Sequence, residues 1–172
     1  MKKKTSVIVL MLLIPTVVLM HVSWRHEDNG LLFNVDGRDV DVVGAFTDWA
    51  RTATNRCQMV HALPSDDPRL GRIQAVIQSY SPPDSMEIRD IHVWTTSHWA
   101  IAEVEFQQLL PAVITLRDVD TPHPAVVEGA IWSGATAPWK SGPRIRSYLK
   151  SRSSDTPQDL LDCFEFQTKH FR

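Results

Sequence analysis

The sequence predicts an α+β fold: an N-terminal transmembrane helix, then two helices packed on a curved four-stranded antiparallel sheet, and short C-terminal helices. Three observations predict it. An uncharged apolar run follows a triple-lysine start, apolar residues recur at helical spacing from residue 42, and four runs rich in β-branched and aromatic residues fill the middle of the chain. Because the helices precede the strands instead of alternating with them, the order is typical of α+β domains.

The first element is the apolar run over residues 5–24, which contains no charged side chain before Arg25. As a helix, about 18 residues span about 27 Å, close to the ~30 Å hydrocarbon core of a bilayer. A signal peptidase needs small residues three and one positions before its cut, and no such pair precedes Arg25. We therefore expect residues 1–24 to be an uncleaved signal-anchor whose residues 5–24 contact the membrane; the alternative is secretion after signal cleavage.

The three lysines also predict an orientation, because basic residues hold the flanking end of a membrane segment in the cytoplasm. The expected location is the cytoplasmic (inner) membrane, single-pass, with the N-terminus inside and the C-terminal domain in the periplasm or outside the cell. Without these lysines the chain holds 15 basic and 20 acidic residues, from totals of 18 and 20, a net charge of −5. A nucleic-acid partner is therefore not expected.

Two segments follow the apolar run. Residues 25–40 are expected to form a juxtamembrane linker or a hairpin, because Asp36-Gly37 lies between two apolar runs and is typical of a two-residue turn. Residues 41–172, about 130 in all, are long enough for one extracytoplasmic α+β domain with its own core.

Two helices are expected next. The first carries an apolar stripe at steps of three and four residues and ends before Pro64. The second begins at Asp67-Pro68, an N-cap followed by a first-turn proline, and ends at the SPPD segment. The inner faces are expected to be Val42, Phe46, Trp49, Ala50, Ala53, Cys57 and Val60 in the first helix, and Leu70, Ile73, Ile77 and Tyr80 in the second.

Four strands are expected in the segments MEIRDIHVWT, HWAIAEVEF, LPAVITLRD and AVVEGAIWS, joined by short connections as in an antiparallel meander. In the second strand, alternate residues should face the core and the remainder should face the opposite side. Pro143 and Pro157 are typical first-turn residues of two short C-terminal helices. The core-facing set of the second strand is Ala100, Ala102, Val104 and Phe106.

Two segments, GAFTDWARTATNRC and IHVWTTSHWAIAEVEF, resemble the opening helix and the central hairpin of the NTF2-like family, a cone-shaped α+β fold. The resemblance covers Asp41 to about Asp118. The family usually closes with long strands from a Gly-Trp turn, whereas here WSGATAPWKSGPRIRSYLKS stands in that place. Members of the family include enzymes, binding modules and assembly proteins, so the resemblance implies a fold and leaves the function open.

The chain has two cysteines, Cys57 and Cys163. Outside the cytoplasm they allow a single intramolecular disulfide. They could equally be two unrelated buried thiols, since free cysteine is commonly buried. No histidine or second cysteine stands at metal-ligand spacing from either one, so neither a metal nor a cofactor is expected.

Catalytic signatures are weak. Glu103 and Glu105 lie two residues apart on one strand, so they share a face about 7 Å apart. Together with His92 and His98, on the preceding strand and its turn, they could form an acid–base pair in a cavity. The alternative is that both glutamates face water from the open side of the sheet.

The segment IWSGATAPWKSGPRIRSYL is the predicted partner-binding surface. It combines aromatic rings with basic side chains in a loop broken by glycine and proline, a composition enriched where proteins bind each other. The alternative is a structured loop whose tryptophans plug the open end of the sheet. The residues are Trp132, Trp139, Lys140, Arg144, Arg146 and Tyr148.

These observations favour a membrane-anchored extracytoplasmic binding protein of the cell envelope whose partner is another envelope protein. One alternative is a small NTF2-like enzyme that uses an acid–base pair from Glu103, Glu105, His92 and His98. Another is an immunity or inhibitor protein held at the membrane, which has the same sequence features as the binding protein.

Overall fold

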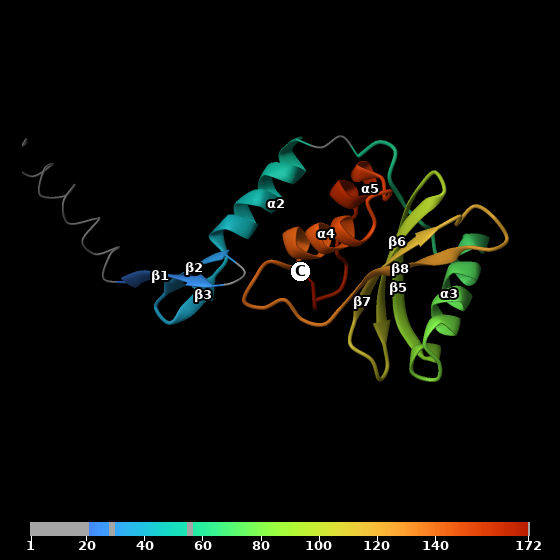
Figure 1. The fold of residues 1–172 in the computed structure, drawn as a ribbon, viewed down its shortest axis with the longest axis horizontal. Coiled ribbons are helices and arrows are strands. Elements are labelled where there is room, and N and C mark those ends of the chain that lie inside the picture. Colours follow the sequence, from blue (N-terminus) through green and yellow to red (C-terminus); the bar gives the residue numbers. More distant parts are fainter. Residues whose placement is uncertain (1–20, 28–29, 55–56, 172) are drawn as a thin grey trace, which may run out of the picture. The chain divides into compact units, whose positions relative to one another are not determined.

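The computed structural model describes residues 21–27, 30–54 and 57–171. The chain divides into two compact units, Met1–Phe46 and Thr47–Arg172, and each is described by itself. Figure 1 shows the elements in the order in which they occur along the chain.

The first unit contains a three-stranded antiparallel sheet of β1 (Val22–Glu27), β2 (Gly30–Val35) and β3 (Arg38–Val40), with β2 in the middle. The β2–β3 turn is formed by Asp36 and Gly37, whose φ angles of 50° and 83° are both left-handed. A two-residue turn of this hand needs positive φ at both positions, which glycine adopts without steric cost. The Asp-Gly pair of the sequence therefore forms a hairpin.

The predicted transmembrane helix is wrong at its C-terminal end, because residues 22–24 belong to this sheet. It was expected to reach residue 24, but Val22 and Trp24 belong to β1 and pair with Val35 and Phe33 of β2. Among the residues that the structure describes, no helix is both long and apolar enough to span a bilayer. The remainder of the expected segment, residues 1–20, lies outside the described residues.

The second unit is built on a five-stranded antiparallel sheet in the order β4-β5-β6-β7-β8. The predicted count of four strands is wrong, because a two-residue strand, β4, pairs with the end of β5 and is too short to show any alternation. The five strands are His61–Ala62, Ile88–Thr96, Trp99–Phe106, Ala112–Arg117 and Ala125–Ser133.

Helices cover both faces of this sheet. The helix α3 (Pro68–Tyr80) lies on one face, and α4 (Ser141–Arg152), α5 (Gln158–Cys163) and the C-terminal segment lie on the other (Figure 1). The helix α3 begins at Asp67, whose carboxylate accepts the backbone N–H of Arg69 at 2.8 Å. A short 3₁₀ turn, η1 (Asp84–Met86), follows α3.

The central strand β6 is buried on both of its faces as a result. Its predicted core set packs with Ile73 and Ile77 of α3. The opposite side, which includes Ile101, packs with Leu149 of α4 and Phe164 after α5. The alternation of β6 is as predicted. Its second face, which the sequence analysis allowed to face water, is covered by α4 and by the segment after α5.

The prediction that two helices pack on the sheet through apolar stripes is wrong for the helix α2 (Val42–Thr54). Three side chains of its expected inner face, Val42, Phe46 and Trp49, are 45%, 64% and 65% exposed. The helix also ends at Thr54, before the last two residues of that stripe. Helical spacing of apolar residues predicted the helix correctly, but it does not specify what covers the stripe.

Candidate functional site

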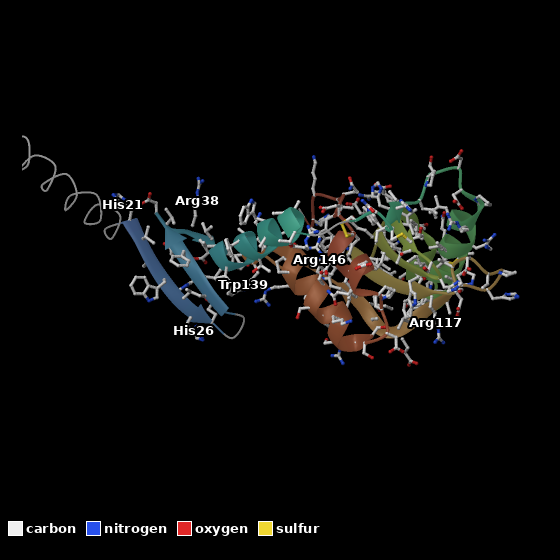
Figure 2. The ribbon with its side chains drawn as sticks, turned by 90° about the horizontal axis from the view of Figure 1, so that it is seen from above. His21, His26, Arg38, Arg117, Trp139 and Arg146 are labelled. Atoms are coloured by element: carbon white, nitrogen blue, oxygen red, sulfur yellow. A yellow bond between two sulfur atoms is a disulfide. The ribbon has the colours of Figure 1, made fainter. Side chains whose placement is uncertain are left out.

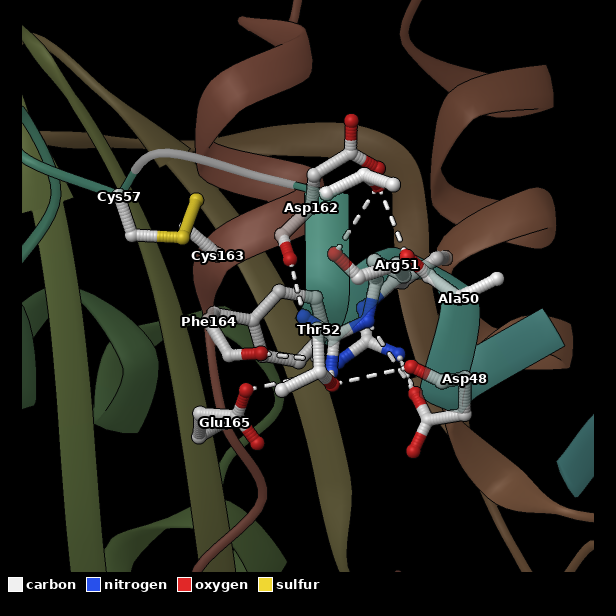
Figure 3. Close-up of polar contacts among 11 residues, drawn as sticks. Asp48, Ala50, Arg51, Thr52, Cys57, Asp162, Cys163, Phe164 and Glu165 are labelled. Carbon is white, nitrogen blue, oxygen red and sulfur yellow. Dashed lines mark hydrogen bonds and ion pairs between the residues drawn. A yellow bond between two sulfur atoms is a disulfide. The ribbon is translucent and has the colours of Figure 1, made fainter. Parts of the chain in front are cut away.

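A row of four alternating charges joins the C-terminal half of α2, the helix α4 and the segment after α5. We call Arg146, Asp48, Arg51 and Glu165, in that order, the charge chain. Asp48 Oδ1 accepts from Arg146 Nη1 at 2.9 Å and from Arg51 Nε at 3.2 Å. Arg51 also donates to Glu165 Oε1 at 3.1 Å and to the carbonyl oxygen of Asp162 (Figure 3).

A disulfide lies beside the charge chain. Cys57 and Cys163, which are 106 residues apart in sequence, are bonded to each other (Figure 3). The bond ties the segment after α2 to the end of α5. Covalent and ionic contacts therefore fix the same elements, and both hold the C-terminal part of the chain against the rest of the second unit.

Arg146 is the buried member of the charge chain, with 7% of its surface exposed. Burial lowers the pKa of its guanidinium, and the nearby positive charge of Arg51 lowers it further, while Asp48 and Glu165 act in the opposite direction. Arg146 Nη2 donates to the Phe164 carbonyl at 2.9 Å. These contacts compensate much of the cost of burying a charge.

Gly142 permits this arrangement at the start of α4. A Cβ at this position would lie 2.6 Å from Arg146 Nη1 and 3.1 Å from Asp48 Oδ1. A real side chain cannot approach so closely, so any other residue would displace the ion pair. The glycine therefore leaves room for the Arg146 guanidinium beside the first turn of the helix.

These elements surround a hollow of about 320 Å³, which we call the polar hollow. Its lining carries carboxylates, cations and a hydroxyl, so it offers both acceptors and donors. Ser141 Oγ is hydrogen-bonded to Thr136 Oγ1 at 2.6 Å, which fixes the loop before α4. The lining residues are Asp48, Lys140, Ser141, Gly142, Arg146, Glu165, Phe166, Gln167 and Phe171.

The predicted partner-binding surface is divided by the structure. Trp132 and Tyr148 pack edge to face with ring centroids 5.2 Å apart, against the core on the α4 side. Arg146 is buried in the charge chain. Trp139 and Arg146 are both labelled in Figure 2; Arg146 is buried and Trp139 is half-buried.

Trp139 and Arg144 form a pair, and Lys140 is next to Trp139 in the chain; we call Trp139, Lys140 and Arg144 the Trp139 rim. The Arg144 guanidinium lies over the Trp139 ring, 4.4 Å from its centroid. Lys140 is exposed and also lines the hollow. A cation over an indole face is a favourable pair.

Glu103 does not face water, so the alternative in which both glutamates face water from the open side of the sheet is wrong for this residue. It is fully buried, and it accepts three hydrogen bonds from the C-terminal segment. Its Oε2 accepts from Gln167 N at 2.7 Å, and its Oε1 accepts from Thr168 N at 3.0 Å and from Thr168 Oγ1 at 2.5 Å. The carboxylate thus holds the end of the chain against β6.

The other acid–base candidates are only partly brought together. His92 pairs directly across the sheet with Glu103, and Glu105 pairs with Asp90. His92 Nε2 contacts Asp90 Oδ2 at 3.0 Å. His98 lies on the β5–β6 turn, where its Nδ1 contacts Asp120 Oδ2 at 2.6 Å. None of the four candidates lines the polar hollow.

Sequence reasoning missed Asp48, Arg51 and Glu165. In the sequence these are ordinary charged residues, and their contacts join positions about 100 residues apart. The one local signal is that Asp48 and Arg51 are three residues apart on a helix, where side chains are neighbours. Across the described residues, no group of three His, Cys, Asp or Glu side chains could hold a metal ion.

The chain matches no model of a known protein family, and no curated protein or solved structure matches it either. The resemblance to the NTF2-like family therefore stays a prediction. Because no relative supplies a function, function has to be argued from the polar hollow, the Trp139 rim and the disulfide.

Proposed function

We propose that this chain is an extracytoplasmic binding protein of the cell envelope, which contacts a partner protein through the Trp139 rim and the polar hollow. The observation that carries the proposal is the Arg144–Trp139 pair, 4.4 Å from cation to ring centroid, next in sequence to Lys140, which lines a hollow with charges of both signs. Tryptophan and arginine dominate the binding energy of many protein interfaces, because they combine large contact area with polar groups.

The compartment is supported by two independent features. A disulfide persists in oxidising surroundings such as the periplasm and is rare in the cytosol, and here it closes a 106-residue separation between Cys57 and Cys163. A basic start followed by an apolar run is typical of a segment that directs export. Together these features favour a location beyond the cytoplasmic membrane.

The mode of contact follows from the chemistry of the hollow. Asp48 and Glu165 offer acceptors and Lys140 offers a donor, so a polar side chain of a partner can find both kinds of group. The Trp139 ring supplies apolar contact beside them. An interface of this type places an aromatic anchor next to a polar recess, as hot-spot clusters do.

In-cell photo-crosslinking tests the proposal. A photoreactive amino acid at position 139 should give a discrete protein adduct, whereas the same group at exposed position 147 of α4 should not. Trp139→Ala and Lys140→Glu should then weaken binding of the captured partner by about ten-fold or more. Identical adducts from both positions, or unchanged affinity of both variants, would overturn the proposal.

An enzyme is the second candidate, and the pairing of His92 with Glu103 across adjacent strands favours it. Against it, both oxygens of Glu103 accept hydrogen bonds from the C-terminal segment. If Glu105→Gln and His92→Gln abolish the cellular phenotype while Trp139→Ala leaves it intact, the enzyme is the better description. An immunity or inhibitor protein would use the same rim, and the identity of the crosslinked partner would distinguish it.

A further inference from the structure

The α3 side of the five-stranded sheet contains a second hollow of about 290 Å³, which we call the apolar pocket. It lies where α3 stops. The helix ends at Tyr80, before two prolines that cannot continue it, while β6 runs to Phe106 and β8 to Ser133. Ala112 of β7 pairs with Ser133 at the same end of the sheet, and among the described residues no α-helix extends over this end.

The floor and the rim of the apolar pocket differ in chemistry. The floor is formed by buried apolar side chains of α3, β6 and β7: Ile77, Phe106, Ala112 and Ile114. The rim is exposed and carries hydroxyl groups together with two leucines: Tyr80, Ser81, Ser133, Leu109 and Leu110. A ligand therefore meets apolar surface inside and neutral hydrogen-bonding groups at the entrance.

No described residue that lines the apolar pocket is charged. A charged group inside would lose its hydration without gaining a partner, which is strongly unfavourable. The hydroxyl of Ser85 is already used, because it donates to the Gln78 carbonyl at 2.7 Å. The part of a ligand that enters must therefore be hydrocarbon.

The size of the apolar pocket limits the length of that hydrocarbon. A dry apolar cavity of about 150 Å³ holds one benzene ring, so about twice that volume accommodates a chain of about ten carbons. The rim extends the apolar path, since Leu110 is 64% exposed. The loop that carries Leu110 is tied to the end of β8 by a hydrogen bond from Gly134 N to the Pro111 carbonyl at 3.3 Å.

We infer that the apolar pocket binds a single acyl chain, methyl end first, with an uncharged hydroxyl or ester head at the hydroxyl groups of the rim. A charged head would find no counter-charge among the lining residues, so a neutral monoacyl lipid fits better than a free fatty acid. The apolar pocket and the polar hollow share no lining residue. The inference is therefore independent of the proposed protein contact.

Photolabelling of the whole 172-residue chain in cell-envelope vesicles tests this inference without detergent, which would compete for the site. The probe is monododecanoylglycerol with a diazirine at the end of its chain. Labelling should fall on residues of the floor, and excess unlabelled monododecanoylglycerol should suppress it. Dodecanoate with the same diazirine should label more weakly. Adducts that lie only outside the apolar pocket would overturn the inference. So would an unlabelled apolar peptide, added as competitor in place of the lipid, that suppresses labelling of the floor as strongly as monododecanoylglycerol does.

A matched pair of variants gives a second measurement. Val126 lines the apolar pocket, whereas Val127, also half-buried on β8, packs on the opposite face of the sheet. Val126→Phe should reduce labelling of the floor by about ten-fold, and Val127→Phe should leave it unchanged. Equal labelling of the two variants would contradict the inference.

A third variant covers the case in which Val126→Phe fails to fold. Leu110→Glu changes an exposed side chain of the rim, so it should retain the melting temperature of the unchanged chain. A carboxylate at the entrance should nevertheless reduce labelling of the floor by about ten-fold, because the acyl chain must pass it. Full labelling of a folded Leu110→Glu variant would overturn the inference.

Discussion

The two faces of the five-stranded sheet are held in different ways. On the α4 side, a disulfide, a buried carboxylate and a buried guanidinium fix the C-terminal segment. On the α3 side, the contacts are apolar, and the end of the sheet beyond α3 encloses the apolar pocket. Polar contacts with defined geometry fix one arrangement, whereas apolar packing is less directional and tolerates a hollow. The α4 side is therefore expected to lose more stability than the α3 side when a single polar contact is removed.

Removing the disulfide should have the largest effect on this comparison. Replacing Cys57 and Cys163 by serine frees a chain segment of about 100 residues, so unfolding should become easier by about 4 kcal/mol. Chemical denaturation measures this change. Reduction of the purified chain should also shift its mobility on a gel, and an unchanged denaturation midpoint would show that the α4 side does not depend on the bond.

Glu103→Ala should have the next largest effect. It leaves the buried backbone N–H and hydroxyl of Thr168 and the part-buried N–H of Gln167 without an acceptor, so stability should fall by about 3 kcal/mol. Glu105→Ala is the control on the same strand, because Glu105 is only half-buried, and its loss should be below about 1 kcal/mol. Similar denaturation midpoints for the two variants would mean that Glu103 does not hold the C-terminal segment.

Arg146→Met should have a smaller effect, because the methionine side chain replaces part of the buried volume. The Phe164 carbonyl loses its donor and Asp48 loses one of two cations, so the expected loss is about 2 kcal/mol. Arg144→Met on the same helix removes a cation above a half-buried ring and should lose below about 1 kcal/mol. A thermal unfolding series with both variants measures the difference, and a larger loss for Arg144→Met would contradict it.

The smallest effect is expected at the start of α3. Hydrogen bonds from the Arg69 side chain and backbone lower the pKa of Asp67 from 3.8 to about 2. A carboxyl whose pKa is lowered on folding contributes stability that is present above pH 3.8 and is lost as the pH falls towards 2. Asp67→Asn should therefore lower the melting temperature at pH 6 but much less at pH 2. An equal decrease at both values would contradict this assignment.

The sequence determined the local features because their causes are local. Strand alternation specified which residues of β6 face the core, and the Asp36-Gly37 pair indicated a hairpin as one of two alternatives, which the structure shows. The Asp67-Pro68 pair specified where α3 begins. Each of these depends on residues within a few positions of one another.

The tertiary structure alone decided the rest. The second face of β6 is covered, and Glu103 is buried beneath residues 167 and 168, from which it accepts hydrogen bonds. Arg146 pairs with Asp48 and is not part of the predicted surface. The stripe of α2 is left exposed. The hydrogen bonds of Glu103 and the Arg146–Asp48 pair join residues 64 to 98 positions apart in sequence, and no local period or spacing predicts which distant segment will supply the partner.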